Sequence, residues 1–210
     1  LLSMAEELDV PIYIHPADPP KEISEKYFQS NDLIITGWAW QVETALHVIR
    51  MISNGVFDRH PGLKIIIGHM GEFIPYGFTR LNQAFTMGSW ILKSDIPKMN
   101  LYYYFKNNIF ITSSGVFDEP VFRCAKDMMG IGSLMFSVDY PFRDNVAAAD
   151  FLNKLQLDES EKSLFAGMNA CKLLKLNEGK VSSGGVSRSE LFKIRLKSRV
   201  GRFLIDKLVK

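Results

Sequence analysis

The most constraining feature of this chain is a short apolar run that ends in chemically active residues. Three consecutive isoleucines, Ile65 to Ile67, are followed by Gly68, His69 and, three residues later, Glu72. A β-branched run that is apolar on both faces is typical of a strand buried on both sides, as in a parallel sheet covered by helices. Ligands of such proteins bind at the carboxyl ends of the strands. His69 is therefore a candidate site residue, although a histidine that only makes a hydrogen bond in a core remains an alternative.

Other segments of the chain alternate between strand and helix patterns. Strands are expected at residues 10–14, 109–112 and 134–138, and helices at 1–9, 41–55, 73–86, 119–129, 147–155 and 160–174. We expect residues 101–105 to be a mobile aromatic segment. The alternation predicts an α/β fold with four parallel strands joined by right-handed crossovers.

Four strands are half of what a closed (β/α)8 barrel needs, and such barrels typically have about 250 residues. An open, doubly wound sheet is compatible with 210 residues, but no glycine-rich phosphate loop follows the first strand. We therefore predict the C-terminal half of a TIM-type (β/α)8 barrel. Such a sheet would have open edges.

Metal-capable or acid–base side chains follow three of the four expected strands. They are His15, His69 and Asp139. Imidazole and carboxylate groups suit zinc or manganese, and a metal in this place can polarise a bound water or a chelated substrate. Glu72 is placed to orient the His69 imidazole. Arg80 is either a carboxylate-binding fork or an ordinary exposed residue of a helix.

Composition places the chain among soluble globular proteins, because 47% of its residues are hydrophobic and 23% are charged. The apolar runs are too short for a transmembrane helix, and no basic leader precedes the acidic residues near the start, so neither membrane insertion nor a signal peptide is expected. Cys124 and Cys171 lack C-x-x-C spacing, which indicates buried thiols in a reducing compartment. We expect a cytoplasmic protein.

The end of the chain differs from its body. After a body of residues 1–178, a Ser- and Gly-rich linker is expected at 179–188 and a basic amphipathic helix at 189–210. We favour a helix that packs on the body or on a partner subunit. Docking on an acidic surface or a membrane is the alternative, and nucleic-acid binding has only the charge in its favour.

An ordered series of motifs identifies a family resemblance. The motifs are Ile-His-Pro at 14–16, Trp-Ala-Trp-Gln-Val-Glu-Thr-Ala at 38–45, Gly-Val-Phe-Asp-Arg-His-Pro-Gly-Leu-Lys at 55–64, Gly-His-Met-Gly-Glu at 68–72, Ile-Thr-Ser-Ser-Gly at 111–115 and Ser-Val-Asp-Tyr-Pro-Phe at 137–142. Together they resemble the non-oxidative decarboxylases of the amidohydrolase superfamily (the aminocarboxymuconate-semialdehyde-decarboxylase-like group), and most of all the γ-resorcylate and 2,3-dihydroxybenzoate decarboxylases. The resemblance runs from Leu1 to Leu176.

The resemblance implies a metal-dependent carboxy-lyase that acts on a hydroxylated aromatic acid such as a dihydroxybenzoate. His15 and Asp139 would be ligands of zinc or manganese on the fifth and eighth barrel strands. His69, Glu72 and Asp139 would form a hydrogen-bonded relay that Arg80 supports, and Asp139 would protonate the ring carbon that bears the carboxylate. The protein would be a homo-oligomer with a small aromatic carboxylate as its ligand. A hydrolase of the same superfamily and an inactive half barrel that acts through association remain alternatives.

The chain departs from the family in one respect that bears on activity. The family's first strand carries a Glu-x-His or similar pair of ligands, and this sequence has no counterpart, so the resemblance implies that the N-terminal half of the barrel is absent. With two protein ligands, metal affinity should fall steeply. We therefore expect this chain alone to be weakly active or inactive unless another chain supplies the missing half.

Overall fold

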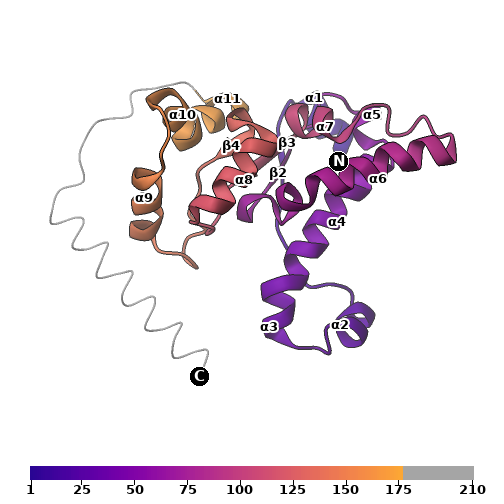
Figure 1. The fold of residues 1–210 in the computed structure, drawn as a ribbon, viewed down its shortest axis with the longest axis horizontal. Helices are drawn as coiled ribbons and strands as arrows, with labels where there is room; N and C mark the ends of the chain where they lie inside the picture. Colours follow the sequence, from indigo (N-terminus) through magenta and orange to yellow (C-terminus); the bar gives the residue numbers. More distant parts are fainter. Residues whose placement is uncertain (177–210) are drawn as a thin grey trace.

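The computed structural model describes residues 1–176 of the 210-residue chain. At its centre lies a parallel sheet in the order β1-β2-β3-β4, of which Figure 1 labels β2, β3 and β4. The strands are β1 (Ile12–Ile14), β2 (Ile65–Ile67), β3 (Ile109–Thr112) and β4 (Leu134–Met135). The predicted four parallel strands are confirmed. The predicted linker and basic helix at 179–210 lie outside the described residues.

The register of the sheet separates two faces. Ile65 is paired with Ile12 and Ile109, and Ile67 is paired in the same way with Ile14 and Ile111. Successive side chains of a strand point to opposite faces, so these isoleucines share one face. That face packs against helices in the main hydrophobic core. Side chains at the intervening positions, such as Tyr13, point to the opposite face.

Helices precede β1 and follow each strand, and most of them contribute side chains to the core on the isoleucine face. They are α1 (Leu2–Glu7), α4 (Trp40–Ser53), α5 (Val56–Arg59), α6 (Ile74–Leu92), α7 (Leu101–Asn107), α8 (Glu119–Met129), α9 (Asn145–Lys154), α10 (Glu159–Ser163) and α11 (Asn169–Leu173). Shorter helical turns lie at η2 (His69–Gly71), η3 (Ile131–Ser133) and η4 (Leu164–Met168). Phe78, Phe105, Phe122 and Phe165 are among the largest fully buried side chains, so aromatic packing between helices and sheet forms much of the core.

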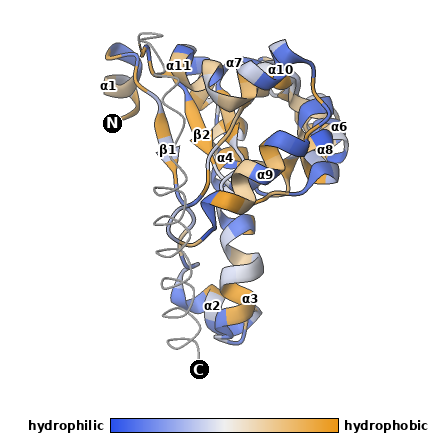
Figure 2. Ribbon diagram, turned by 90° about the vertical axis from the view of Figure 1, so that its left-hand side faces the viewer, coloured by the Kyte–Doolittle hydropathy of each residue, from blue (hydrophilic) through white to orange (hydrophobic). Residues whose placement is uncertain are grey.

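Two helices stand apart from the sheet. α2 (Lys21–Tyr27) and α3 (Asp32–Ile34) lie at the far end of α4, and Figures 1 and 2 both show them away from the body. The π-turn η1 (Ile35–Ala39) joins α3 directly to α4, which makes one continuous helical stretch. Figure 2 also shows that β1 and β2 are coloured mainly as hydrophobic. No helix within residues 1–176 is both long and apolar enough to cross a membrane.

Two local predictions were wrong. The segment at 101–105 is the start of helix α7, because Asn100 accepts a hydrogen bond from the Tyr103 amide as its N-cap and Leu101, Tyr104 and Phe105 are buried on one face. The last strand ends at Met135, three residues earlier than expected. The chain leaves the ladder there, since the Phe136 amide donates to the Phe165 carbonyl.

Candidate active site at the carboxyl ends of the strands

His15 follows β1 directly and presents one ring nitrogen to the site. Its Nδ1 lies 2.7 Å from the carbonyl oxygen of Pro16. A carbonyl only accepts hydrogen bonds, so Nδ1 carries the proton and Nε2 keeps a lone pair, which is the usual arrangement of a histidine that binds a metal. The Trp40 ring lies edge-on to the imidazole at 6.5 Å, and its indole N–H donates to Asp18 at 2.6 Å.

A left-handed turn places the next two side chains. The five residues from His69 to Phe73 have φ values of 47°, 55°, 90°, 52° and 64°. Only Gly71 among them adopts this conformation without cost; each other residue costs about 1–2 kcal/mol. Gly71 also has no room for a side chain, since a Cβ atom would lie 2.9 Å from Ile111 Cδ1. The turn folds the chain back so that Glu72 lies buried beneath His69.

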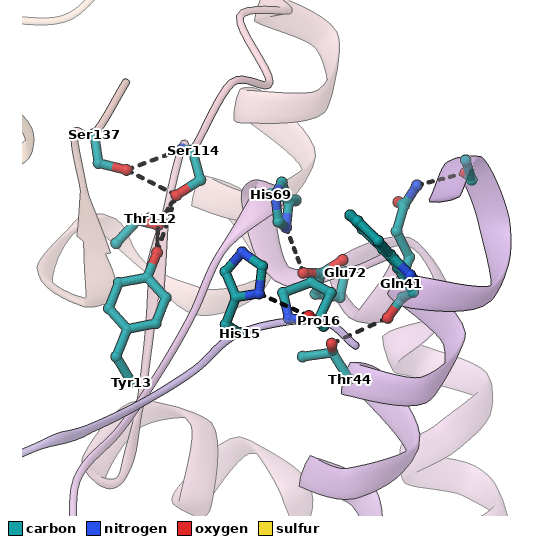
Figure 3. A network of polar contacts seen from close by, with 12 residues as sticks. Tyr13, His15, Pro16, Gln41, Thr44, His69, Glu72, Thr112, Ser114 and Ser137 are labelled. Atoms are coloured by element: carbon teal, nitrogen blue, oxygen red, sulfur yellow. Dashed lines mark hydrogen bonds and ion pairs between the residues drawn. The ribbon is translucent and has the colours of Figure 1, made fainter. Parts of the chain in front are cut away.

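His69 and Glu72 form a short hydrogen-bonded pair. His69 Nδ1 lies 2.5 Å from Glu72 Oε1 (Figure 3). The bond to the carboxylate raises the pKa of His69, and burial raises the pKa of Glu72. Both directions mean that the pair holds a proton more tightly than free side chains do. The second oxygen, Glu72 Oε2, is buried and has no hydrogen-bond partner among residues 1–176.

The remaining charged groups of the site surround this pair. Asp139, which has a positive φ of 68°, is close enough to raise the pKa of His69 further, whereas the positive charge of Arg143 lowers it. Burial is the largest influence on Glu72, and His15 lies close enough that a positive charge on its ring would lower the pKa of that carboxyl. The structure thus gathers His15, His69, Glu72 and Asp139 at one edge of the sheet.

Arg80 is placed differently. It lies exposed on α6 and makes no hydrogen bond or ion pair with any residue between 1 and 176, so its support of the relay stays a prediction. In the same range, no three His, Cys, Asp or Glu side chains form a group that could hold a metal ion.

A network of hydroxyl groups, which sequence reasoning missed, lies beside His15 (Figure 3). The Tyr13 hydroxyl is 2.6 Å from Thr112 Oγ1 and 2.9 Å from Ser114 Oγ, and those two oxygens are 2.7 Å apart. Ser114 Oγ also lies 2.8 Å from Ser137 Oγ. The network links β1, β3 and the segment after β4. Tyr13 precedes His15 by two residues and Ser137 precedes Asp139 by two, and this spacing is a signal that the sequence contains.

Comparison with known proteins agrees with this geometry. The family model described as "Amidohydrolase" matches residues 1–176. The decarboxylase orsB of Emericella nidulans is 36% identical over an alignment of 188 residues that covers 84% of this chain and 56% of that protein. The γ-resorcylate decarboxylase of Rhodococcus jostii is 34% identical over an alignment of 177 residues that covers 82% of this chain and 52% of that protein. The chain thus spans about half the length of the curated relatives it matches.

Solved structures of similar proteins extend the comparison. A 2,6-dihydroxybenzoate decarboxylase in complex with 2,6-dihydroxybenzoate has a TM-score of 0.75 and 34% identity, covering 83% of this chain and 53% of that one. A dihydroxybenzoic acid decarboxylase from Polaromonas with bound manganese and the inhibitor 2-nitroresorcinol has a TM-score of 0.75 and 34% identity, covering 83% and 52%. The described strands and helices therefore correspond to half of a TIM-type barrel, as predicted.

Proposed function

The chain belongs to the amidohydrolase family, and we propose that it is a metal-dependent, non-oxidative decarboxylase of a hydroxylated aromatic acid. The observation that carries the proposal is the meeting of His15, the His69–Glu72 pair and Asp139 at the carboxyl ends of parallel strands. This is where parallel barrels bind their ligands. The names of the similar proteins, γ-resorcylate and 2,6-dihydroxybenzoate decarboxylase, support the choice of reaction and of substrate class.

The donor set of the site fits a divalent metal. His15 would bind through Nε2 and Asp139 through its carboxylate, and we propose manganese over zinc because manganese is bound in the similar Polaromonas structure. A bound divalent metal would supply positive charge beside the carboxylate and phenolate of an ortho-hydroxybenzoate. Since no third metal-capable side chain joins these two within the described part of the chain, we expect this chain alone to bind manganese weakly.

The protein's own groups would move the proton. Asp139 donates a proton to the ring carbon that bears the carboxylate, and an electron pair of the ring forms the new bond from this carbon to the proton. The bond from this carbon to the carboxylate then breaks, its electron pair restores the aromatic ring, and CO2 leaves. His69, whose pKa is raised by the bond to Glu72, lies near Asp139 and is placed to return a proton to it.

Decarboxylation of 2,6-dihydroxybenzoate to resorcinol tests the proposal. Because this chain alone should bind the metal weakly, we expect it to release resorcinol and CO2 slowly and in equal amounts at high Mn²⁺ concentration, and Asp139→Asn to release none. Asp150→Asn, an exposed carboxylate on α9, is the matched control and should keep the wild-type rate. Cleavage of aryl esters, lactones or amides without any resorcinol from the acid would favour the hydrolase alternative.

An inactive half barrel that acts through association is the second candidate. Two observations favour it: the lack of a three-residue metal group among residues 1–176, and edge strands β1 and β4 that each pair on one side only within that range. We propose that the chain forms homo-oligomers in either case. Light scattering on the purified chain measures its mass, and a stable oligomer that neither binds Mn²⁺ nor releases resorcinol would favour this candidate over the decarboxylase.

A further inference from the structure

We propose that Arg143 binds the carboxylate group of the substrate. The inference rests on the proposed function, because it names the residue that recognises the acid at the same site. The family motifs quoted above do not include Arg143, and it is the fold that brings this residue to the site. It follows Asp139 by four residues, and its amide donates a hydrogen bond of 3.0 Å to the Asp139 carbonyl oxygen, so one turn of backbone holds the two residues together.

Gly115 makes room for the Arg143 side chain. A Cβ atom at position 115 would lie 2.6 Å from Arg143 Cγ, 3.0 Å from Nε and 3.3 Å from Cδ. The stem of Arg143 therefore lies directly on the backbone that follows β3, in the space that any other residue at 115 would fill. This contact places the stem of Arg143, which lies before α9, against the segment that follows the carboxyl end of β3.

The charge of Arg143 reaches the proton-holding pair. Glu72 and then Asp139 raise the pKa of His69, and the charge of the exposed Arg143 lowers it, so the guanidinium lies near enough to act on that imidazole. No carboxylate forms an ion pair with Arg143 among residues 1–176, although lysines and another arginine elsewhere in that range do have such partners. A cation without a carboxylate partner beside the expected position of an anionic substrate is suited to bind that anion.

The chemistry of the reaction explains the use of such a cation. A guanidinium offers planar, paired N–H donors that match the two oxygens of a carboxylate. The acid is negatively charged and binds to Arg143, whereas the phenol that remains after CO2 leaves has no carboxylate and loses this interaction. Arg143 thus favours binding of the acid over binding of the product.

Equilibrium binding of two ligands tests the inference. The dissociation constants of 2,6-dihydroxybenzoate and of resorcinol are measured by titration calorimetry on the full chain with Mn²⁺, for wild type, Arg143→Gln and Arg143→Lys. We expect Arg143→Gln to weaken binding of the acid about tenfold, which corresponds to about 1.4 kcal/mol, and to leave resorcinol unchanged. Arg143→Lys should lie between the two. Arg123→Gln, which removes an exposed arginine of α8, is the control and should change neither constant.

The outcomes separate this inference from the proposed function. The inference is overturned if wild type and Arg143→Gln bind the acid equally well. It is also overturned if Arg143→Gln loses affinity for the acid and for resorcinol by the same factor, or if wild type does not bind the acid. If wild type then still releases resorcinol from the acid, the function stands without Arg143. If Arg143→Gln selectively weakens the acid while wild type releases no resorcinol, Arg143 is confirmed as a carboxylate-binding residue and the decarboxylase proposal fails.

Discussion

Replacing Gly115 by alanine should separate backbone strain from ligand recognition. Gly115 has a φ of +81°, and the added Cβ atom would lie 2.6 Å from Arg143 Cγ, which is closer than real Cβ atoms approach other atoms. The strained φ should lower the free energy of unfolding by about 1–2 kcal/mol. The arginine stem is flexible, so it should move away from position 115 at little further cost and take the guanidinium with it.

A second glycine provides the matched control. Gly130 has the same φ of 81°, with ψ of 148°, and nothing lies within 4 Å of the Cβ position there. Gly130→Ala should therefore cost about 1–3 kcal/mol for the backbone, because this region of φ and ψ is open almost only to glycine. It cannot displace Arg143. The pair of variants thus compares similar strain with and without movement of the guanidinium.

Urea unfolding and ligand titration together measure the two effects. Both alanine variants should unfold at lower urea concentration than wild type, with unchanged slopes of the transition. Only Gly115→Ala should lose the preference for 2,6-dihydroxybenzoate over resorcinol, by about tenfold. The reasoning is refuted if Gly115→Ala keeps the wild-type preference, or if Gly130→Ala loses it to the same extent.

Three further predictions follow from contacts in the described chain. The raised pKa of His69 contributes stability that is fully present below about pH 6.5 and is lost as pH rises through its folded-state value. Glu72→Gln should make the free energy of unfolding, measured in urea from pH 6 to 9, depend less on pH than it does in wild type. The same pH dependence in both proteins would contradict this prediction. Tyr13→Phe removes two hydroxyl contacts and should lower the free energy of unfolding by about 1–2 kcal/mol and weaken Mn²⁺ binding in calorimetry, and unchanged metal affinity would show that the network does not position His15. Burial, with the bond to Asp58, raises the pKa of Tyr104 to about 12, so ultraviolet titration of Tyr104→Phe should lack the last phenol to ionise, and an unaltered alkaline step would refute that assignment.

Much of the fold follows from apolar spacing. The isoleucines of β2 and β3 and the pattern of α8 mark these elements in the sequence, since burial on a sheet or on one helix face requires that spacing. The error at α7 has a local cause. Its three buried aromatic and aliphatic residues are also compatible with an irregular aromatic segment. The N-cap at Asn100 favours a helix only once the residues that pack against this segment are known.

Some residues of the site could likewise be predicted from the sequence, and others could not. His15, His69 and Asp139 were predicted because each follows an apolar strand, and the structure places them together. Arg143 could not be predicted, because its approach to His69 depends on the missing side chain of Gly115, a contact between two different loops. The order of apolar and polar residues within one segment does not predict a contact with a residue of another segment.

The left-handed turn from His69 to Phe73 has a consequence for folding kinetics. Its residues other than Gly71 prefer right-handed conformations in an unfolded chain, so the turn is stable only after β2 and α6 have packed on either side of it. We expect substitutions in the turn to have kinetic φ-values, the ratios of the change in folding barrier to the change in stability, near zero. Such substitutions should change the unfolding rate and leave the folding rate nearly unchanged. The His69–Glu72 pair would then be among the last parts of the chain to form.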